Sequence, residues 1–381
     1  MDSSDKATET NQTLPGQDQW DHSVGGVRSG GKGSGGMRRR ALLAAVGDAS
    51  HPDTFSGISS HFLAAAVAEG VLNGGLSLTT DGPRWQLRRW SWNLKAVLLG
   101  DRSGGYQFSV PFLEALWAPH QHLLRGALLM NVFQLYPPSV VGDPSIEKWF
   151  FIDQPLLALF DDYGTRASIG RRVARESLER ERQGYHAAAG VIAHSRWAAN
   201  SLIDDYGVPS DKVHVVVPGA NLDPESYGEW ERAEIRRRET SASLTGKDSI
   251  RFVFVGKDWK RKGLDRLLRG LALARRQGAD VTLRVIGCPR EALPSELRDT
   301  SGIEWCGFIN KREDPKRFLR LVAECDVGCL LSRAEAGGIS LREYHALGLA
   351  VFGTTAGGAP EHADPEASWL LGADAANDTS T

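Results

Sequence analysis

Residues 252–276 read FVFVGKDWKRKGLDRLLRGLALARR, and this stretch decides the fold class. The four apolar residues 252–255 predict a buried strand, and residues 256–263 form a loop with two glycines and four cations. Apolar residues then recur at helical spacing through Leu264–Arg276, which predicts a helix. A strand, a glycine loop and a helix in this order are typical of α/β units that bind phosphate at a helix N-terminus.

The same alternation continues through the rest of the second half. Apolar runs predict further strands at 281–286, 303–306, 327–331 and 350–352. Helical patterns separate them at 314–324 and 339–347. Strands this apolar, alternating with helices, indicate a parallel sheet covered on both faces.

The first half shows the pattern less clearly. Strands are predicted at 41–46, 149–152, 191–193 and 214–217, with helices at 61–69, 168–186 and 196–206. Residues 75–143 have no clear period. We therefore predict a leader at 1–37, disordered because it is polar, and two Rossmann-like α/β domains at 38–217 and 218–381.

Composition narrows the function class. The 381 residues are 41% hydrophobic and 24% charged, and the net charge of −2 argues against general nucleic-acid binding. The N-terminus has no apolar signal core, and the uncharged run 126–142 contains Asn131 and Gln134, so no membrane span is predicted, although peripheral membrane contact stays open. No CxxC pair occurs, and Cys325 and Cys329 are expected in one buried strand, as small hydrophobic side chains rather than metal ligands. From this use of cysteine we expect a reducing, cytoplasmic location; the four cysteines are Cys288, Cys306, Cys325 and Cys329.

Two more glycine-rich loops follow predicted strands. Residues 332–343 read SRAEAGGISLRE, with seven residues between Glu335 and Glu343, and residues 354–361 read TTAGGAPE. A carboxylate near a helix start can accept two neighbouring hydroxyls, as sugars and ribose present them. Each loop alone is compatible with a solvated turn or an ordinary helix-terminal acid. Three such loops at the carboxyl edge of one parallel sheet indicate a ligand site.

With these motifs the chain resembles the retaining glycosyltransferases of sequence family four, also called group 1 glycosyltransferases. The GKxxxxKG loop, Gly307-Phe308, the two spaced glutamates and GGxPE carry the resemblance. It implies the GT-B fold, in which two Rossmann-like domains face a central cleft. In this family a C-terminal helix crosses back to the first domain, and we expect that helix to be missing because the residues after Glu361 show no pattern for it.

The resemblance implies catalytic roles for three residues. Lys257 and Lys262 match the basic pair that holds the donor diphosphate, with Lys257 where the family more often has arginine. Glu335 matches the acid that contacts the transferred sugar. Backbone N–H groups are expected to assist it, from Gly337, Gly338 and Ile339.

The resemblance also implies a nucleotide side. Glu343 matches the ribose-binding acid, and the backbone of Phe308 and Ile309 is expected to contact the base. Ser56 and Gly57 match a glycine loop of the first domain that closes over the diphosphate.

The first domain departs from the family at one position. Asp153 matches an acid that often follows a histidine, but here Ile152 precedes it, so the usual sugar-contacting histidine is absent. Weaker candidates for acceptor contacts are His120, Gln121 and His122. A Trp/Arg cluster could also touch a lipid-linked or polyanionic acceptor, although an amphipathic helix with snorkelling arginines explains it as well; its members are Arg84, Trp85, Arg88, Arg89, Trp90 and Trp92.

The implied activity is retaining transfer of a hexose-type sugar from a nucleotide diphosphate sugar to a glycan, lipid-linked or small-molecule acceptor. No metal or cofactor is expected, since no Asp-x-Asp pair occurs and the lysines with a helix N-terminus can stabilise the leaving diphosphate. Another GT-B enzyme, such as a sugar-nucleotide epimerase, is disfavoured by the glutamate pair. A different class stays open, a non-catalytic or degenerate protein that only binds a sugar nucleotide.

Overall fold

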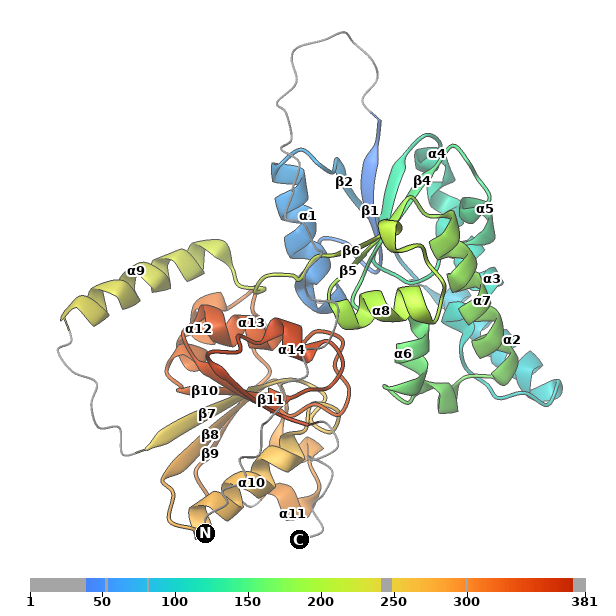
Figure 1. Ribbon diagram of the computed structural model, residues 1–381. Helices are drawn as coiled ribbons and strands as arrows, with labels where there is room; N and C mark the ends of the chain where they lie inside the picture. The colour runs from blue at the N-terminus through green and yellow to red at the C-terminus, as the bar shows by residue number, and fades with distance from the viewer. Residues whose placement is uncertain (1–38, 52–53, 81, 241–248, 299–300, 373–381) are drawn as a thin grey trace, which may run out of the picture. The chain divides into compact units, whose positions relative to one another are not determined.

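The computed structural model describes residues 39–372, apart from 52–53, 81, 241–248 and 299–300 (Figure 1). The leader predicted at 1–37 lies outside the described residues. From Arg39 onward the chain is one unit that contains two six-stranded sheets, and every strand pairing in them is parallel. The predicted α/β class with two Rossmann-like halves is confirmed.

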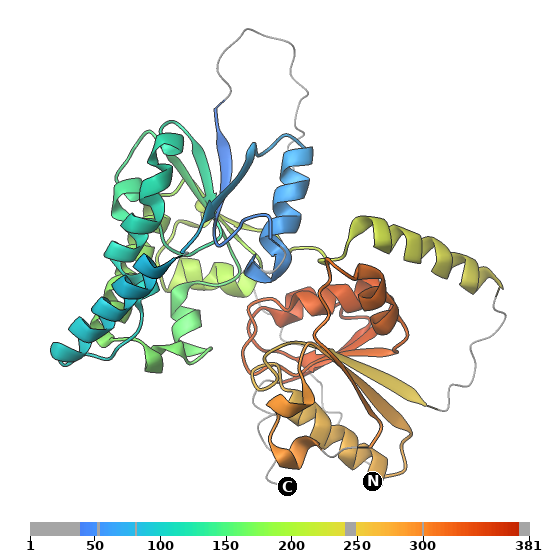
Figure 2. The same cartoon turned by 180° about the vertical axis from the view of Figure 1, so that it is seen from behind.

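The first sheet has the strand order β2-β1-β3-β4-β5-β6. Its strands are β1 (Ala41–Val46), β2 (Gly74–Leu78), β3 (Leu128–Asn131), β4 (Glu147–Ile152), β5 (Gly190–Ala193) and β6 (Val213–Val215). Side chains alternate across the sheet, so Leu43 and Ala45 pack with helix α1 (Ile58–Ala68) while Ala44 joins the core on the other face. Figure 2 shows α1 on one side of this sheet, with most other helices of this half on the opposite side.

The other helices of this half enclose an aromatic core. They are α2 (Pro83–Leu98), α3 (Val110–Trp117), α4 (Gln121–Leu124), α5 (Pro138–Val141), α6 (Leu156–Asp161), α7 (Arg171–Ala187) and α8 (Arg196–Asp204). Trp117, Phe150 and Tyr185 are fully buried there. Ser195 is the N-cap of α8, since its hydroxyl accepts a hydrogen bond from the Ala198 N–H at 3.1 Å.

The second sheet has the order β12-β11-β10-β7-β8-β9. Its strands are β7 (Ile250–Val255), β8 (Val281–Ile286), β9 (Ile303–Gly307), β10 (Val327–Leu330), β11 (Ala350–Thr354) and β12 (Ser368–Leu371). The chain runs outward from β7 to β9, then returns to the other side of β7 and runs outward again from β10 to β12. The neighbours β7 and β10 therefore mark the switch point, where parallel sheets of this kind bind ligands.

Helices cover both faces of the second sheet. They are α9 (Pro224–Thr240), α10 (Leu264–Arg276), α11 (Ser295–Arg298), α12 (Pro315–Ala323), α13 (Ile339–Ala346) and α14 (Ala359–His362). Residues of α10 and α11 pack with Phe254 and Cys329 on one face, and residues of α12 and α13 pack with Val253 and Leu330 on the other. Figure 1 shows the two layers on opposite sides of the strands.

Several local predictions were wrong or incomplete. Cys325 lies in the turn before β10, where its thiol donates to the Leu321 carbonyl, so only Cys329 lies in the strand. The strand predicted at 214–217 ends at Val215, and strand β12 was not predicted. In the part of the chain described, no helix has the length and apolar character needed to cross a bilayer.

Candidate functional site

The loops after β7 and β10 meet at the switch point of the second sheet. Arg261 of the basic loop donates from Nη1 to Glu335 Oε2 at 3.1 Å and to the Ala334 carbonyl at 2.8 Å. The Ser332 hydroxyl donates to the same Glu335 oxygen at 3.1 Å. These donors orient a carboxylate that is only 9% exposed. The cation that holds Glu335 is therefore Arg261, a residue to which the sequence prediction gave no role.

Close contacts surround the two glycines of the basic loop, and at Gly263 they are with backbone. A Cβ at Gly256 would lie 2.5 Å from the Lys262 Cδ atom, so glycine lets the lysine side chain pass over the backbone. A Cβ at Gly263, whose φ is +73°, would lie 1.9 Å from the Leu331 carbonyl oxygen. Burial lowers the pKa of Lys262, and the nearby Glu335 carboxylate opposes that shift. The loop thus holds a lysine at the carboxyl edge of the sheet, close to Glu335.

Lys257 contacts the segment that was predicted to meet the nucleotide base. Its Nζ atom is 4.3 Å from the centroid of the Phe308 ring, a cation–π contact. Phe308 is exposed and Ile309, beside it, is buried. The structure therefore brings the predicted phosphate-binding lysine and the predicted base-contacting segment together.

Glu343 lies in the second turn of α13 and is 1% exposed. One of its oxygens, Oε1, accepts a hydrogen bond from Lys311 Nζ. The other, Oε2, is buried and has no partner among the described residues. Because an unpaired buried oxygen is costly, Oε2 is suited to accept a hydrogen bond from a ligand hydroxyl. The sequence prediction missed Lys311, although a lysine soon after a strand end was the available signal.

The residues predicted to donate backbone N–H groups lie at the N-terminus of α13. Gly338 precedes the helix with φ +82°, and a Cβ at Gly337 would lie 2.8 Å from His362 Nε2. The Ser340 hydroxyl, in the first turn, is buried with no partner in the described part of the chain. Together with Ile339, these residues leave a helix N-terminus with an unused donor beside Glu335.

Contacts also join these loops to residues of the first half. The Ala336 N–H donates to the Tyr163 hydroxyl at 2.9 Å, and the Arg261 guanidinium lies 5.1 Å from the Tyr163 ring centroid. The Glu361 carboxylate accepts from the N–H groups of Arg196 and Trp197, at 2.7 and 3.0 Å. Glu361 of the GGxPE motif therefore caps α8.

The first-half candidates lie at the carboxyl edge of their own sheet. Gly57 ends a short 3-10 helix, Thr54–Gly57, that includes Ser56, and with φ +84° it precedes α1. His61 in the first turn of α1 has its pKa lowered by burial, an effect that the Glu343 carboxylate opposes. The start of α1 is therefore within electrostatic range of Glu343.

Asp153 follows β4 in a mostly buried position. Burial raises its pKa to about 7, and the Glu335 carboxylate contributes in the same direction. Its Oδ1 atom is buried and makes no hydrogen bond to any described residue. A carboxyl group in this state can exchange a proton near neutral pH.

The position before Asp153 is part of the core, because Ile152 is fully buried. A histidine is nevertheless present at the end of the neighbouring strand β5. His194 is 1% exposed and packs against Phe151 at a ring-centroid distance of 4.3 Å. Burial lowers its pKa to about 3, so the ring is neutral. The sequence prediction missed His194, and strand adjacency was the signal that could have found it.

Comparison with known families agrees with this geometry. The family model described as "Glycosyl transferases group 1" matches residues 249–379, and that described as "Glycosyltransferase Family 4" matches residues 160–224. Over these two segments the chain matches the group 1, or family four, glycosyltransferases. The first match contains the Lys257, Glu335 and Glu343 loops, and the second contains His194 and α8.

Similar curated proteins are named D-inositol 3-phosphate glycosyltransferases. That of Corynebacterium kroppenstedtii is 27% identical over 199 residues, which is 50% of this chain and 44% of that protein. That of Corynebacterium glutamicum is 28% identical over 209 residues, which is 52% of this chain and 47% of that protein. The chain thus spans about half the length of the curated relatives it matches.

Solved structures show the fold. Sucrose-phosphate synthase from Thermosynechococcus elongatus superposes with a TM-score of 0.60 at 17% identity, covering 89% of this chain and 87% of that one. WaaG, a glycosyltransferase involved in lipopolysaccharide biosynthesis, superposes with a TM-score of 0.56 at 17% identity, covering 89% of both chains. The fold is GT-B, as the sequence predicted.

Proposed function

We propose that this chain is a retaining hexosyltransferase that uses a nucleotide diphosphate sugar as donor. The observation that carries the proposal is the arrangement around Glu335, a nearly buried carboxylate held by Arg261 and Ser332 beside Lys262 and a helix N-terminus. Such a site offers an acceptor to sugar hydroxyls and cations to a diphosphate within one small volume.

Each part of the donor has a matching group. Lys257, Lys262 and the first turn of α13 would bind the diphosphate, because lysines and unpaired N–H groups favour anions. Glu343 Oε2 would accept a hydrogen bond from a ribose hydroxyl, and the segment from Phe308 to Ile309 would meet the base. Gly57 would close the site from the first half.

The proposed reaction exchanges one bond at the anomeric carbon for another. The bond from this carbon to the diphosphate oxygen breaks, and a bond to the acceptor hydroxyl oxygen forms on the same face. The hydroxyl proton passes to the departing phosphate oxygen. Lys257, Lys262 and the α13 N-terminus would stabilise the charge that develops on the diphosphate, so the proposal includes neither a metal nor a cofactor.

The acceptor belongs to the glycan, lipid-linked or small-molecule class. Because the curated relatives are named for D-inositol 3-phosphate, a phosphorylated polyol is the first acceptor to test. We also propose a cytoplasmic location, which four free thiols support: Cys288, Cys306, Cys325 and Cys329.

A second candidate is a protein that binds a sugar nucleotide without turning it over. Ile152 in the place of a histidine and Lys257 in the place of an arginine favour it. A panel of nucleotide sugars in a thermal-shift assay would identify the donor, since a ligand at about 100 times its dissociation constant adds roughly 2.7 kcal/mol of stability.

Hydrolysis of the selected donor then separates the two candidates. Turnover that is lost in Glu335→Gln, with binding retained, supports the transferase. Glu291→Gln, which changes an exposed acid that is not among the proposed donor-binding residues, should leave turnover unchanged. Saturable binding of the donor would favour the binding protein if the donor is not hydrolysed and no sugar is transferred to any acceptor in a panel that includes inositol phosphates.

A further inference from the structure

Helix α2 of the first half docks through one face only. Trp85 stacks edge-on against Phe112 at 5.4 Å between ring centroids, and Trp92 contacts Tyr106 at 5.9 Å. The Asn93 side chain accepts from the Gly104 N–H at 3.1 Å. Since successive residues turn about 100° around a helix, Trp85 and Trp92 lie within about 20° of each other and define this docked face.

A second apolar stripe runs along the opposite face. Leu94 lies nine residues after Trp85, which places it about 180° away, and the neighbours on its side are also apolar. No residue of α2 is buried. The stripe, which we name the α2 apolar stripe, is highly exposed: Leu87 66%, Trp90 66%, Leu94 44%, Val97 59% and Leu98 77%. One helix therefore has two apolar faces, and only one of them has a partner in the described structure.

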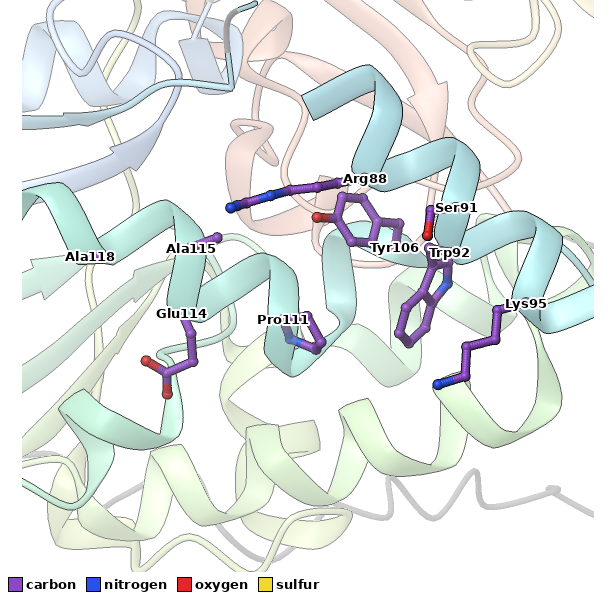
Figure 3. Close-up of a pocket in the computed structure, with 9 residues that line it drawn as sticks. All are labelled: Arg88, Ser91, Trp92, Lys95, Tyr106, Pro111, Glu114, Ala115 and Ala118. Atoms are coloured by element: carbon purple, nitrogen blue, oxygen red, sulfur yellow. The ribbon is translucent and has the colours of Figure 1, made fainter. Parts of the chain in front are cut away.

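Cations flank the α2 apolar stripe, and the helix contains no acidic residue. Arg84, Arg88 and Lys95 lie along one flank, whereas Arg89 lies about 40° from Trp85, nearer the docked face. Figure 3 shows Arg88 and Lys95 projecting from α2 beside a groove of about 600 Å³ that α2 shares with α3. Glu114 lines the same groove, but its carboxylate already accepts from the Ser139 N–H and hydroxyl, at 2.9 and 2.6 Å.

We propose that α2 is an interfacial helix that docks this protein on an anionic phospholipid surface. An apolar stripe that includes a tryptophan, with arginines and a lysine along one flank, has the chemistry of helices that lie at the boundary between headgroups and acyl chains. The cations attract anionic lipids, and their long side chains keep the charged ends in the headgroup layer. Pairing of this stripe with that of a second copy would instead bring together six flanking cations, three from each copy, with no opposing acid on either helix.

Vesicle sedimentation of the full chain tests the proposal and needs neither donor nor acceptor. We expect binding to vesicles of phosphatidylcholine with about a third phosphatidylglycerol, weak binding to phosphatidylcholine alone, and loss of binding at high salt. The double variant Trp90→Ser/Leu94→Ser should bind at least about tenfold more weakly, because both side chains would insert into the membrane. Both residues are exposed, so the variant should keep the melting temperature of the wild-type protein.

The matched control is Trp369→Ser on β12, because Trp369 is 66% exposed, the same fraction as Trp90. Binding that falls equally in the control and the α2 variant would overturn the assignment to α2. Equal binding to neutral and anionic vesicles, or none to either, would overturn the proposal for an anionic membrane. A dimer in sedimentation equilibrium that Trp90→Ser/Leu94→Ser disrupts, without vesicle binding, would assign the stripe to a second copy instead.

Discussion

The ion pair between Lys311 and Glu343 is open to a quantitative test. The Glu343 side chain is 1% exposed and that of Lys311 is 36% exposed. Removing one partner of a fully buried pair costs about 3–5 kcal/mol, because the other charge stays buried without compensation. Water reaches the lysine end here, so we expect Lys311→Met to lower the free energy of unfolding by about 2 kcal/mol. For a domain of this size, that corresponds to a drop in melting temperature of roughly 4–8 °C.

Urea unfolding of four proteins measures this prediction: the wild type, Lys311→Met, Glu343→Gln and the double variant. The double variant should lose about 1–2 kcal/mol less than the sum of the two single losses, because glutamine at position 343 leaves no buried charge without a partner. Lys316→Met is the matched control, since Lys316 ion-pairs with Glu229 at 2.7 Å on the surface. That change should cost less than about 0.5 kcal/mol. Additive losses, or a Lys311→Met effect no larger than that of the control, would refute a buried charge on Glu343.

Further predictions concern turnover and pH. Lys262→Ala should lower turnover by roughly two to three orders of magnitude; an unchanged kcat at saturating donor contradicts its role. Glu335→Ala should depress kcat, whereas Glu343→Ala should mainly weaken donor binding, and the reverse pattern in steady-state kinetics would exchange their roles. Activity should survive EDTA; complete loss that Mn²⁺ or Mg²⁺ restores would contradict a metal-free reaction. Burial raises the pKa of Glu181 to about 8 in the folded protein, whereas the carboxyl of the unfolded chain ionises near its ordinary pKa of 4.5. The free energy of unfolding should therefore fall as the pH rises from about 4.5 to 8. Thermal melts of Glu181→Gln should show a shallower slope, because Asp153, whose pKa burial raises to about 7, contributes in the same direction; an equal slope in both proteins would exclude Glu181 as a source.

The fold of the second half could be predicted from sequence because local signals agree there. Continuous apolar runs, glycine turns and a helical period all point to the same elements, and the predicted helix Leu264–Arg276 coincides with α10. Residues 75–143 lack such agreement. That segment contains β2, α2, α3 and β3, along with α4 and α5 of four residues each. Helices as short as α4 and α5 span only about one helical turn, so they show no helical period in the sequence. Tertiary packing around Trp117 and Tyr136 decides the course of the chain there.

The candidate site was predictable by loop but less so by residue. The basic loop contains four cations, and only the folded backbone determines that Arg261, rather than a lysine, contacts Glu335. Glu361 offers a similar lesson, because it caps α8 from 165 residues away along the chain. No pattern of sequence spacing reports such a partner. Motifs therefore indicate which loops surround a ligand, whereas contacts between loops determine which side chains reach it.

The histidine question shows how the two kinds of information combine. The sequence places Ile152 where a sugar-contacting histidine is usual, which favours a degenerate protein. In the structure, Ile152 pairs with Ala193 on the adjacent strand, and the next residue there is His194, whose N–H donates to the Ile152 carbonyl at 3.0 Å.

Neither ring nitrogen of His194 has a partner among the described residues, although the ring is 1% exposed and packs against Phe151 and Phe55. An apolar side chain would fill the same space without the roughly 1–3 kcal/mol that an unsatisfied buried polar group costs. Buried polar groups without partners are concentrated at functional sites, where a ligand can satisfy them. The unpaired imidazole at the carboxyl edge of the first sheet, close to the unpaired Oδ1 of Asp153, therefore weighs against a degenerate scaffold and in favour of an active site.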